Sequence, residues 1–304
     1  MEKERRLTRR NGKTVGQCYL MLAPSLIGLC LFVIYPILWT LRFCLFRYGG
    51  YGEPIFVGLN NFVRAFTKTP RFWESVANSF TFAFCKLAVE LPLALFLAVL
   101  INRKFKGRDF FRTIYFLPTM ISTAIVGVVF YFLFAAHNGV INGYLKVLGL
   151  ISKDIDWFSD KNNGILIMCI ASIWQNFGLN MIFFLSGLQS IPQEIYESST
   201  IDGATGWKQF WSITFPMLGP VLVIVVMNAF LGSLKVTDLV LVLTNGAPGG
   251  HTDTMMSYIY KLFFQSKSQP DYGFGSALVL ICAIILGIIT VLYLKLSKKY
   301  QNIY

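Results

Sequence analysis

The chain has 304 residues, of which 55% are hydrophobic and 14% are charged, and its formal net charge is +12. Because a soluble domain carries about 25% charged residues, this composition excludes an ordinary soluble protein and indicates an integral membrane protein. The positive charge does not require a nucleic acid partner. Basic residues instead gather beside apolar runs, where they orient a membrane protein: Lys3, Arg5, Arg6, Arg9, Arg10 and Lys13 near the start, and Arg103, Lys104, Lys106, Arg108 and Arg112 after the second run.

Six apolar segments are long enough to cross a membrane, which takes about 20 residues. They cover residues 19–41, 76–101, 114–134, 165–188, 217–243 and 274–296. The predicted fold class is therefore all-α, a polytopic membrane protein with six transmembrane helices. The first segment exceeds the core of a signal peptide, which has about 7–15 apolar residues, so we expect it to be retained as a helix.

Six spans place both termini on the same side of the membrane. The basic flanks predict that this side is the cytoplasm, and Lys295, Lys298 and Lys299 near the carboxyl end agree. The chain then divides into a basic cytoplasmic segment at residues 1–18 and a transmembrane domain at residues 19–304. Within that domain, residues 42–74 form an external loop and residues 190–216 a cytoplasmic loop.

Cysteine and histidine usage indicates neither a disulfide framework nor a metal site. The six cysteines are not closely paired, and most lie in or beside apolar runs, where they resemble small buried hydrophobic residues. His137 and His251 are the only histidines, so a zinc site built on histidine is not available. We expect no metal and no cofactor in this chain.

Four charged residues fall inside the apolar segments, where unpaired charge is expensive. Lys86 and Glu90 are four residues apart and share a helix face, and an internal ion pair is the favoured interpretation. Lys235 and Asp238 are three residues apart and should also share a face. For this second pair, an ion pair between helices and a place in a substrate path both stay open.

The loop at residues 190–216 is polar but has the pattern of two short helices. Glu194 and Glu197 follow Pro192 in a first turn, where the helix dipole favours acid. Gly203 ends that helix, since glycine adopts left-handed backbone angles cheaply. A second helix at residues 207–213 leads to Pro216. The loop is acidic for a cytoplasmic one, which favours a protein-binding role over a solvated linker.

This loop resembles the EAA loop of ABC importer permease subunits. That pattern is Glu-Ala-Ala, three residues, Gly, nine residues, then Ile-x-Leu-Pro. Here it stands as Glu197-Ser198-Ser199, Gly203, and Ile213-Thr214-Phe215-Pro216, with serines for both alanines and phenylalanine for leucine. Further pieces appear in the family's order, so that the resemblance covers nearly the whole chain: Ala23-Pro24, Tyr35-Pro36, Phe116-Leu117-Pro118, Trp174-Gln175-Asn176-Phe177-Gly178 and Asn245-Gly246-Ala247-Pro248.

The resemblance implies a type I ABC importer permease fold and two sets of functional residues. The coupling loop, residues 190–216, would dock into an ATPase subunit through Glu194, Glu197, Ser198, Ser199, Asp202, Gly203, Ala204 and Pro216. The substrate path would include Asn228, Ser233, Lys235, Thr237 and Asp238 of the fifth span, with the Ser233–Thr237 face favoured as the lining. Tyr131, Trp174 and Phe230 could stack on a sugar, although packing is favoured for each ring.

The resemblance further implies a bacterial inner-membrane subunit for uptake of a sugar or oligosaccharide. The chain lacks a phosphate-binding loop, so ATP and magnesium would bind to a separate ATPase, and the chain itself is not an enzyme. Its partners would be a second permease in a heterodimer, an ATPase dimer, an extracellular binding protein, the sugar and membrane lipid. Two alternatives stay open: a permease for glycerol-phosphate or another small polar solute, and an ion-coupled secondary transporter.

Overall fold

The computed structural model describes residues 2–103, 105–265 and 270–301, and the side chains of residues 15–103, 105–265 and 270–298. Within these ranges the chain is overwhelmingly helical, which confirms the all-α prediction. The basic side chains from Lys3 to Lys13, Lys104 and the side chain of Lys299 lie outside what the structure describes.

Four helical segments of the described chain are long and apolar enough to cross a membrane. The first is continuous from α1 (Glu2–Leu29) through the π-helical turn η1 (Cys30–Ile34) into α2 (Tyr35–Phe43). The others are α4 (Pro70–Asn102), α8 (Lys161–Gln189) and α15 (Tyr272–Gln301). With each of two bent helix pairs counted as one span, the number is six, in agreement with the six segments predicted.

The bent pairs differ from the straight spans expected at residues 114–134 and 217–243. In the first pair, α5 (Arg108–Phe116) and the 3-10 turn η2 (Leu117–Met120) meet α6 (Thr123–Leu133) at 93°. In the second, α10 (Gly206–Gln209), the π-helical turn η3 (Phe210–Thr214) and α11 (Phe215–Met217) meet α12 (Gly219–Leu234) at 67°. A proline stands near each bend, at Pro118, Pro216 and Pro220. Proline lacks the backbone N–H that a continuous helix needs.

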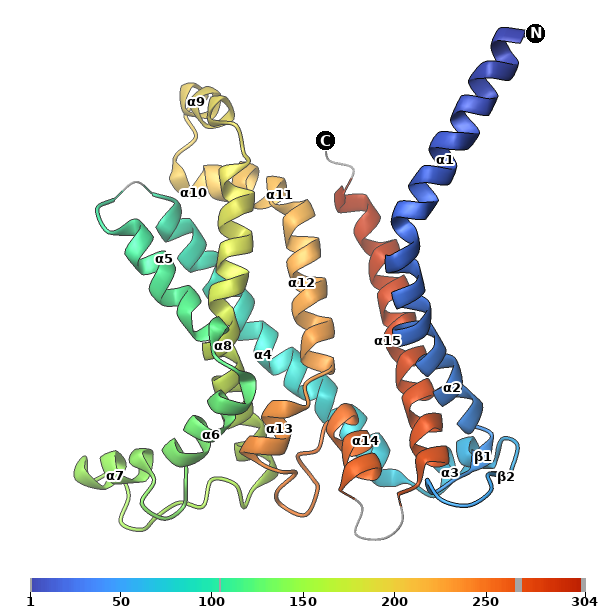
Figure 1. Cartoon of the computed structure of the whole chain (residues 1–304). Coiled ribbons are helices and arrows are strands. Elements are labelled where there is room, and N and C mark those ends of the chain that lie inside the picture. Colours follow the sequence, from blue (N-terminus) through green and yellow to red (C-terminus); the bar gives the residue numbers. More distant parts are fainter. Residues whose placement is uncertain (1, 104, 266–269, 302–304) are drawn as a thin grey trace.

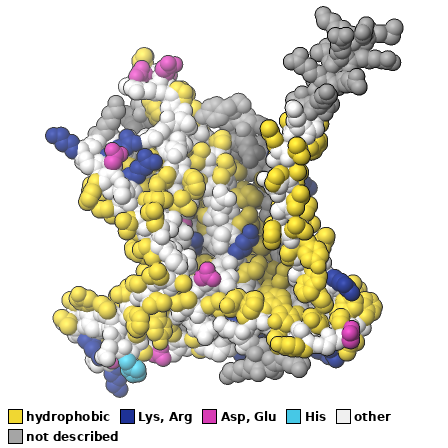
Figure 2. All heavy atoms as spheres, in the orientation of Figure 1, with side chains coloured by type: hydrophobic (Ala, Val, Ile, Leu, Met, Phe, Trp, Pro, Cys, Tyr) yellow, Lys and Arg dark blue, Asp and Glu magenta, His cyan; other side chains and the backbone are white. Residues whose placement is uncertain are grey.

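The spans form an open array in which α4 crosses behind α8 and α12 (Figure 1). Helix α4 packs along α8 and also contacts α12, while α12 contacts both α8 and α15. Helix α1 leans away from the rest, and the first span meets α15 through α2 (Figure 1). Apolar side chains cover much of the visible surface of this first span (Figure 2), as expected for a surface that faces lipid or another membrane protein.

The two ends of the array carry different elements (Figure 1). At one end lie the paired strands β1 (Phe46–Arg47) and β2 (Ile55–Phe56), with α3 (Asn60–Thr67), α7 (Val140–Val147), α13 (Asp238–Leu243) and α14 (Met255–Phe264). At the other end lie α9 (Gln193–Ile201), α10 and the ends of α1 and α15. Both termini therefore lie on the side of the 190–216 loop, as the even number of spans requires.

Polar contacts hold the spans together at the end away from α9. The Glu74 carboxylate on α4 accepts from Lys161 Nζ on α8 at 2.9 Å and lies 2.7 Å from His251 Nδ1. Asn78 Nδ2, one turn further along α4, donates to the backbone carbonyls of His251 and Asp253 at 2.7 and 2.9 Å. These contacts fix the loop between α13 and α14 against α4 and α8.

Candidate functional site

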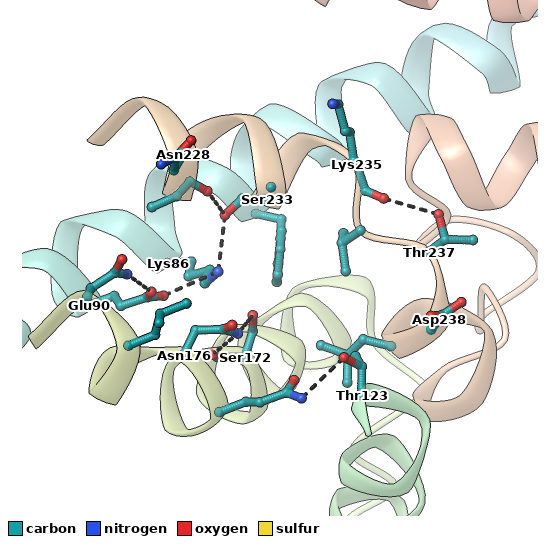
Figure 3. A pocket seen from close by; sticks show the side chains of 18 of the residues that line it. Lys86, Glu90, Thr123, Ser172, Asn176, Asn228, Ser233, Lys235, Thr237 and Asp238 are labelled. Carbon is teal, nitrogen blue, oxygen red and sulfur yellow. Dashed lines mark hydrogen bonds and ion pairs between the residues drawn. The ribbon is translucent and has the colours of Figure 1, made fainter. Parts of the chain in front are cut away.

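A polar cavity of about 440 Å³ lies between α4, α8, α12 and the start of α13. All five residues predicted for the substrate path border it: Asn228, Ser233, Lys235, Thr237 and Asp238. They come from the end of α12 and from the chain that follows it (Figure 3). The structure therefore brings together residues that the sequence had assigned to one long span.

Buried charges form one wall of this cavity. Lys86 Nζ lies 3.3 Å from Glu90 Oε2 on the same helix and donates to Ser233 Oγ on α12 at 3.2 Å. Asn180 Nδ2 on α8 donates to the other carboxylate oxygen of Glu90 at 2.6 Å. Lys86 and Glu90 are only 5% and 0% exposed, so each charge needs the other. The predicted ion pair is confirmed, and it ties three spans together at the cavity wall (Figure 3).

The arrangement expected for Lys235 and Asp238 is wrong, because α12 ends at Leu234 and α13 begins at Asp238. The chain between them is not helical, and Thr237 has φ −134° and ψ −60°. The Lys235 ammonium points away from Asp238 (Figure 3), and within the described chain no ion pair joins the two. The pairing of Ser233 with Thr237 on one helix face fails for the same reason.

Two side-chain hydrogen bonds stabilise this break in the fifth span, one from another element and one from within the break. Thr254 Oγ1 donates to the Val236 carbonyl at 2.8 Å, and Thr237 Oγ1 donates to the Lys235 carbonyl at 3.2 Å. The Lys235 and Val236 carbonyls lie beyond the last residue of α12, and these side chains supply a hydrogen-bond donor to each. The sequence favoured the Ser233–Thr237 face over the Lys235–Asp238 face as the cavity lining. All four residues border the cavity, so this distinction does not apply.

The α8 wall of the cavity carries polar residues that the sequence reasoning did not select. Ser172, Asn176 and Asn180 are spaced four residues apart and all border the cavity. Asn176 Nδ2 donates to the Ser172 carbonyl at 2.8 Å, which holds the two side chains on one face. The sequence could have indicated this wall, because a polar stripe at i, i+4, i+8 in an apolar segment marks a helix face turned away from lipid.

The three aromatic rings considered for sugar stacking pack against other rings instead. Tyr131 stacks on Phe158 with ring centres 5.8 Å apart, and Trp174 lies 5.9 Å from Phe130. Phe230 lies 5.5 Å from Phe84. The packing role favoured for these rings agrees with these contacts.

The 190–216 loop forms the two predicted short helices, with Gly203 between them at φ +80°. The first, α9, begins one residue after Pro192, which precedes the helix and is not part of its first turn. The second is not the simple helix expected at 207–213, because it runs from α10 through η3 into α11. Glycine supplies the left-handed turn at no steric cost.

The residues predicted for coupling divide by exposure. Glu194, Glu197, Ser198, Asp202 and Gly203 are exposed, Ala204 is half-buried and Ser199 is buried. Acidic side chains gather at this tip of the molecule (Figure 2). Pro216 is set apart from them in α11 (Phe215–Met217), next to the bend that leads into α12. The exposed tip is thus an acidic helix held clear of the spans.

Comparison with known proteins gives one family over most of the chain. Residues 90–299 match the family described as the binding-protein-dependent transport system inner membrane component. The trehalose/maltose transport system permease protein MalF of Thermococcus litoralis is 32% identical, covering 92% of this chain and 93% of its own. The arabinooligosaccharides transport system permease protein AraP of Bacillus subtilis is 31% identical, covering 93% and 89%.

The fold also has a close match among solved structures. A chain of the crystallised bacterial alginate ABC transporter, in complex with an alginate pentasaccharide-bound periplasmic protein, superposes with a TM-score of 0.82. It is 26% identical, and the alignment covers 96% of this chain and 98% of that one.

Proposed function

The chain belongs to the family of binding-protein-dependent transport system inner membrane components, and we propose that it forms half of a heterodimeric pore for a sugar or oligosaccharide. The second half would be another permease of the same family. The observation that carries this proposal is the cavity between α4, α8 and α12, which is bordered by polar side chains from all three helices.

The chemistry of the cavity suits a polyhydroxylated solute. Amides at Asn176 and Asn228 and the hydroxyl of Thr237 can both donate to and accept from sugar hydroxyls. The Lys86 ammonium is already paired with Glu90, so it presents little uncompensated charge. The named relatives transport trehalose or maltose and arabinooligosaccharides, which supports a sugar over glycerol-phosphate or an ion-coupled solute.

The acidic tip supports a partner on the side of the termini. We propose that α9 docks on an ATPase subunit with a basic groove, and that this side is the cytoplasm. The permease would use no cofactor of its own, and ATP and magnesium would bind to the ATPase dimer. An extracellular binding protein would deliver the sugar at the opposite end, where α3, α7 and α14 lie. The alginate relative was crystallised with such a protein.

The proposed cycle needs no covalent chemistry in this chain. Closure of the ATPase dimer would displace α9, and the pore would change from an inward-facing to an outward-facing state. A ligand shifts such an equilibrium only through a difference in its contacts with the two states. ATP at the ATPase and the loaded binding protein at the outer face would supply those differences.

Two measurements test this assignment. First, the tagged chain is purified after coexpression with a second permease of the same family, an ATPase and a binding protein from the same organism. We expect a stable complex with two different permeases, and recovery of this chain alone or as a homodimer would contradict the proposal. Second, calorimetry with the cognate binding protein and a panel of sugars and sugar phosphates identifies the solute. Binding of a phosphate ester alone would favour the alternative.

A further inference from the structure

A side-chain amide fixes the exposed helix α9 to the segment that follows it. Gln209, the last residue of α10, donates through Nε2 to Ser199 Oγ and to Thr200 Oγ1, both at 3.0 Å. The same nitrogen approaches the Tyr196 carbonyl at 3.5 Å. Ser199 is held in turn, since its hydroxyl donates to the Tyr196 carbonyl at 2.8 Å. One amide thus contacts the last two turns of α9.

A second contact joins α9 to the far end of the same segment. The Tyr196 hydroxyl lies 2.9 Å from Thr214 Oγ1, the last residue of η3. Thr214 is 7% exposed, so this contact is shielded from water. The two contacts bracket residues 206–214, with Gln209 near the start and Thr214 at the end. They leave little freedom for α9 to move without that segment.

The contacts made by Gln209 and Thr214 matter because two glycines stand at the link between α9 and α10, and glycine adopts many backbone conformations. Gly203 and Gly206 stand on either side of the link from α9 to α10, and each has open space where a side chain would be. Glycine pays the largest conformational entropy to be ordered, so this link alone would transmit motion poorly. Most of α9 is exposed, and Ser199 is its buried residue.

The clamped segment leads into α12 through the 67° bend between Met217 and Gly219. Residues 206–217 continue into α12, a 16-residue helix whose far end carries Ser233. Ser233 accepts from Lys86 at the cavity wall, and Lys235 follows at the helix end. A displacement of residues 206–217 that is carried across this bend would therefore reach the residues of α12 that border the cavity.

We propose that this group of contacts transmits the movement of α9 to α12 and so to the cavity. We call it the Gln209 clamp, and it consists of Gln209, Tyr196, Ser199, Thr200 and Thr214. The inference rests on the function proposed above. Gln209 is a positioning residue that contacts neither sugar nor nucleotide. Two of the groups that accept from Gln209 are the hydroxyls of Ser199 and Thr200. The EAA pattern has alanine at position 199, and alanine there would remove one of these acceptors.

The test uses the complete transporter in lipid vesicles, with both permeases, the ATPase and the binding protein. Gln209→Leu removes the donor and keeps the length of the side chain. Gln189→Leu is the matched control, because Gln189 is exposed at the end of α8 and its side chain makes no hydrogen bond in the described structure. We measure sugar uptake and ATP hydrolysis in the same preparation, and report uptake per ATP.

We expect Gln209→Leu to assemble and to hydrolyse ATP, while uptake per ATP falls about tenfold, the factor that matches the loss of one or two net hydrogen bonds. Gln189→Leu should leave the ratio unchanged. Thr200→Val removes one acceptor at an exposed site and should give a smaller loss. Once Gln209 is leucine, adding Thr200→Val should cause no further loss, since the contact is already broken.

The outcomes separate the clamp from the function on which it rests. If the unmutated chain binds no ATPase, the proposed function fails and the clamp fails with it. If the unmutated complex transports and Gln209→Leu shows the same uptake per ATP, the clamp alone is wrong. Additive losses from Gln209→Leu and Thr200→Val would also overturn it. Should Gln209→Leu fail to assemble, unchanged uptake per ATP in Thr200→Val would contradict the proposal.

Discussion

Lys86 Nζ on α4 donates to Ser233 Oγ on α12 at 3.2 Å. The two residues are 147 positions apart in the sequence, and their contact joins two spans at the wall of the cavity. Ser233 is 2% exposed and its hydroxyl also donates to the Ala229 carbonyl at 2.7 Å. Ser233 therefore helps to hold Lys86 in place, and under the proposed function we expect the more open residues nearby to contact the sugar.

The buried ion pair gives the first prediction. Lys86→Met would leave Glu90 buried beside Asn180 without a counter-charge, and breaking such a pair costs about 3–5 kcal/mol. We expect a lower thermal midpoint for the purified protein and a lower yield of assembled complex. Lys86→Met combined with Glu90→Gln should recover most of the loss, because no buried charge remains. A double variant as unstable as Lys86→Met would contradict this account.

The turn after α9 gives the second prediction. Gly203 has φ +80°, so Gly203→Val strains the backbone by about 1–2 kcal/mol even though the space around it is open. Gly206 has equally open surroundings without a left-handed backbone, which makes Gly206→Val the matched control. Uptake should fall strongly in the first variant and little in the second, with both inserted normally. Equal uptake in the two variants would show that the left-handed turn is not needed.

The orientation of the chain gives the third prediction. Single cysteines at the exposed positions Asn60, Lys153 and Lys208 are placed in a chain whose own six cysteines have been replaced, since Cys18, Cys30 and Cys85 are exposed. A thiol reagent that does not cross membranes should label the first two in intact cells. Labelling of the third should require an opened membrane. The reverse pattern would place the termini outside and the proposed docking helix on the wrong side.

The sequence predicted the spans well because hydrophobic length is a strong signal, but it did not show where a span breaks. The fifth apolar segment continues to Leu243, and although Gly232 lies in the last turn of α12, no proline or glycine follows the helix end at Leu234 before Leu243. The break is stabilised from elsewhere, by the Thr254 hydroxyl on the Val236 carbonyl, a contact between residues 18 apart. Periodicity in one segment cannot reveal a tertiary contact of this kind.

The two parts of the candidate site were predictable to different degrees. Gly203 was placed correctly because its conformation depends on local backbone sterics. Ser199 was grouped with the exposed coupling residues, yet it is buried under Gln209, and no local pattern indicated that contact. The cavity needed α8 as well as α12, and the stripe of Ser172, Asn176 and Asn180 was the sequence signal that could have supplied it.

Asn228 is the most suitable position at which to test the cavity as the sugar path. It is exposed and borders the cavity, and its side chain makes no hydrogen bond in the described structure, so a larger side chain fills space without breaking the core. Leu292 on α15 is also exposed but lies outside the cavity. Asn228→Trp and Leu292→Trp therefore add the same bulk inside and outside the proposed path.

The most direct measurement is uptake of labelled sugar by the complete transporter in vesicles. ATP is supplied on the side of the membrane where the ATPase lies, and loaded binding protein is supplied on the opposite side. We predict uptake that requires both, and a fall of about tenfold or more in Asn228→Trp, since each 1.4 kcal/mol added to the barrier is tenfold in rate. Leu292→Trp should transport normally. Normal uptake by Asn228→Trp, or uptake without ATP or binding protein, would contradict the account.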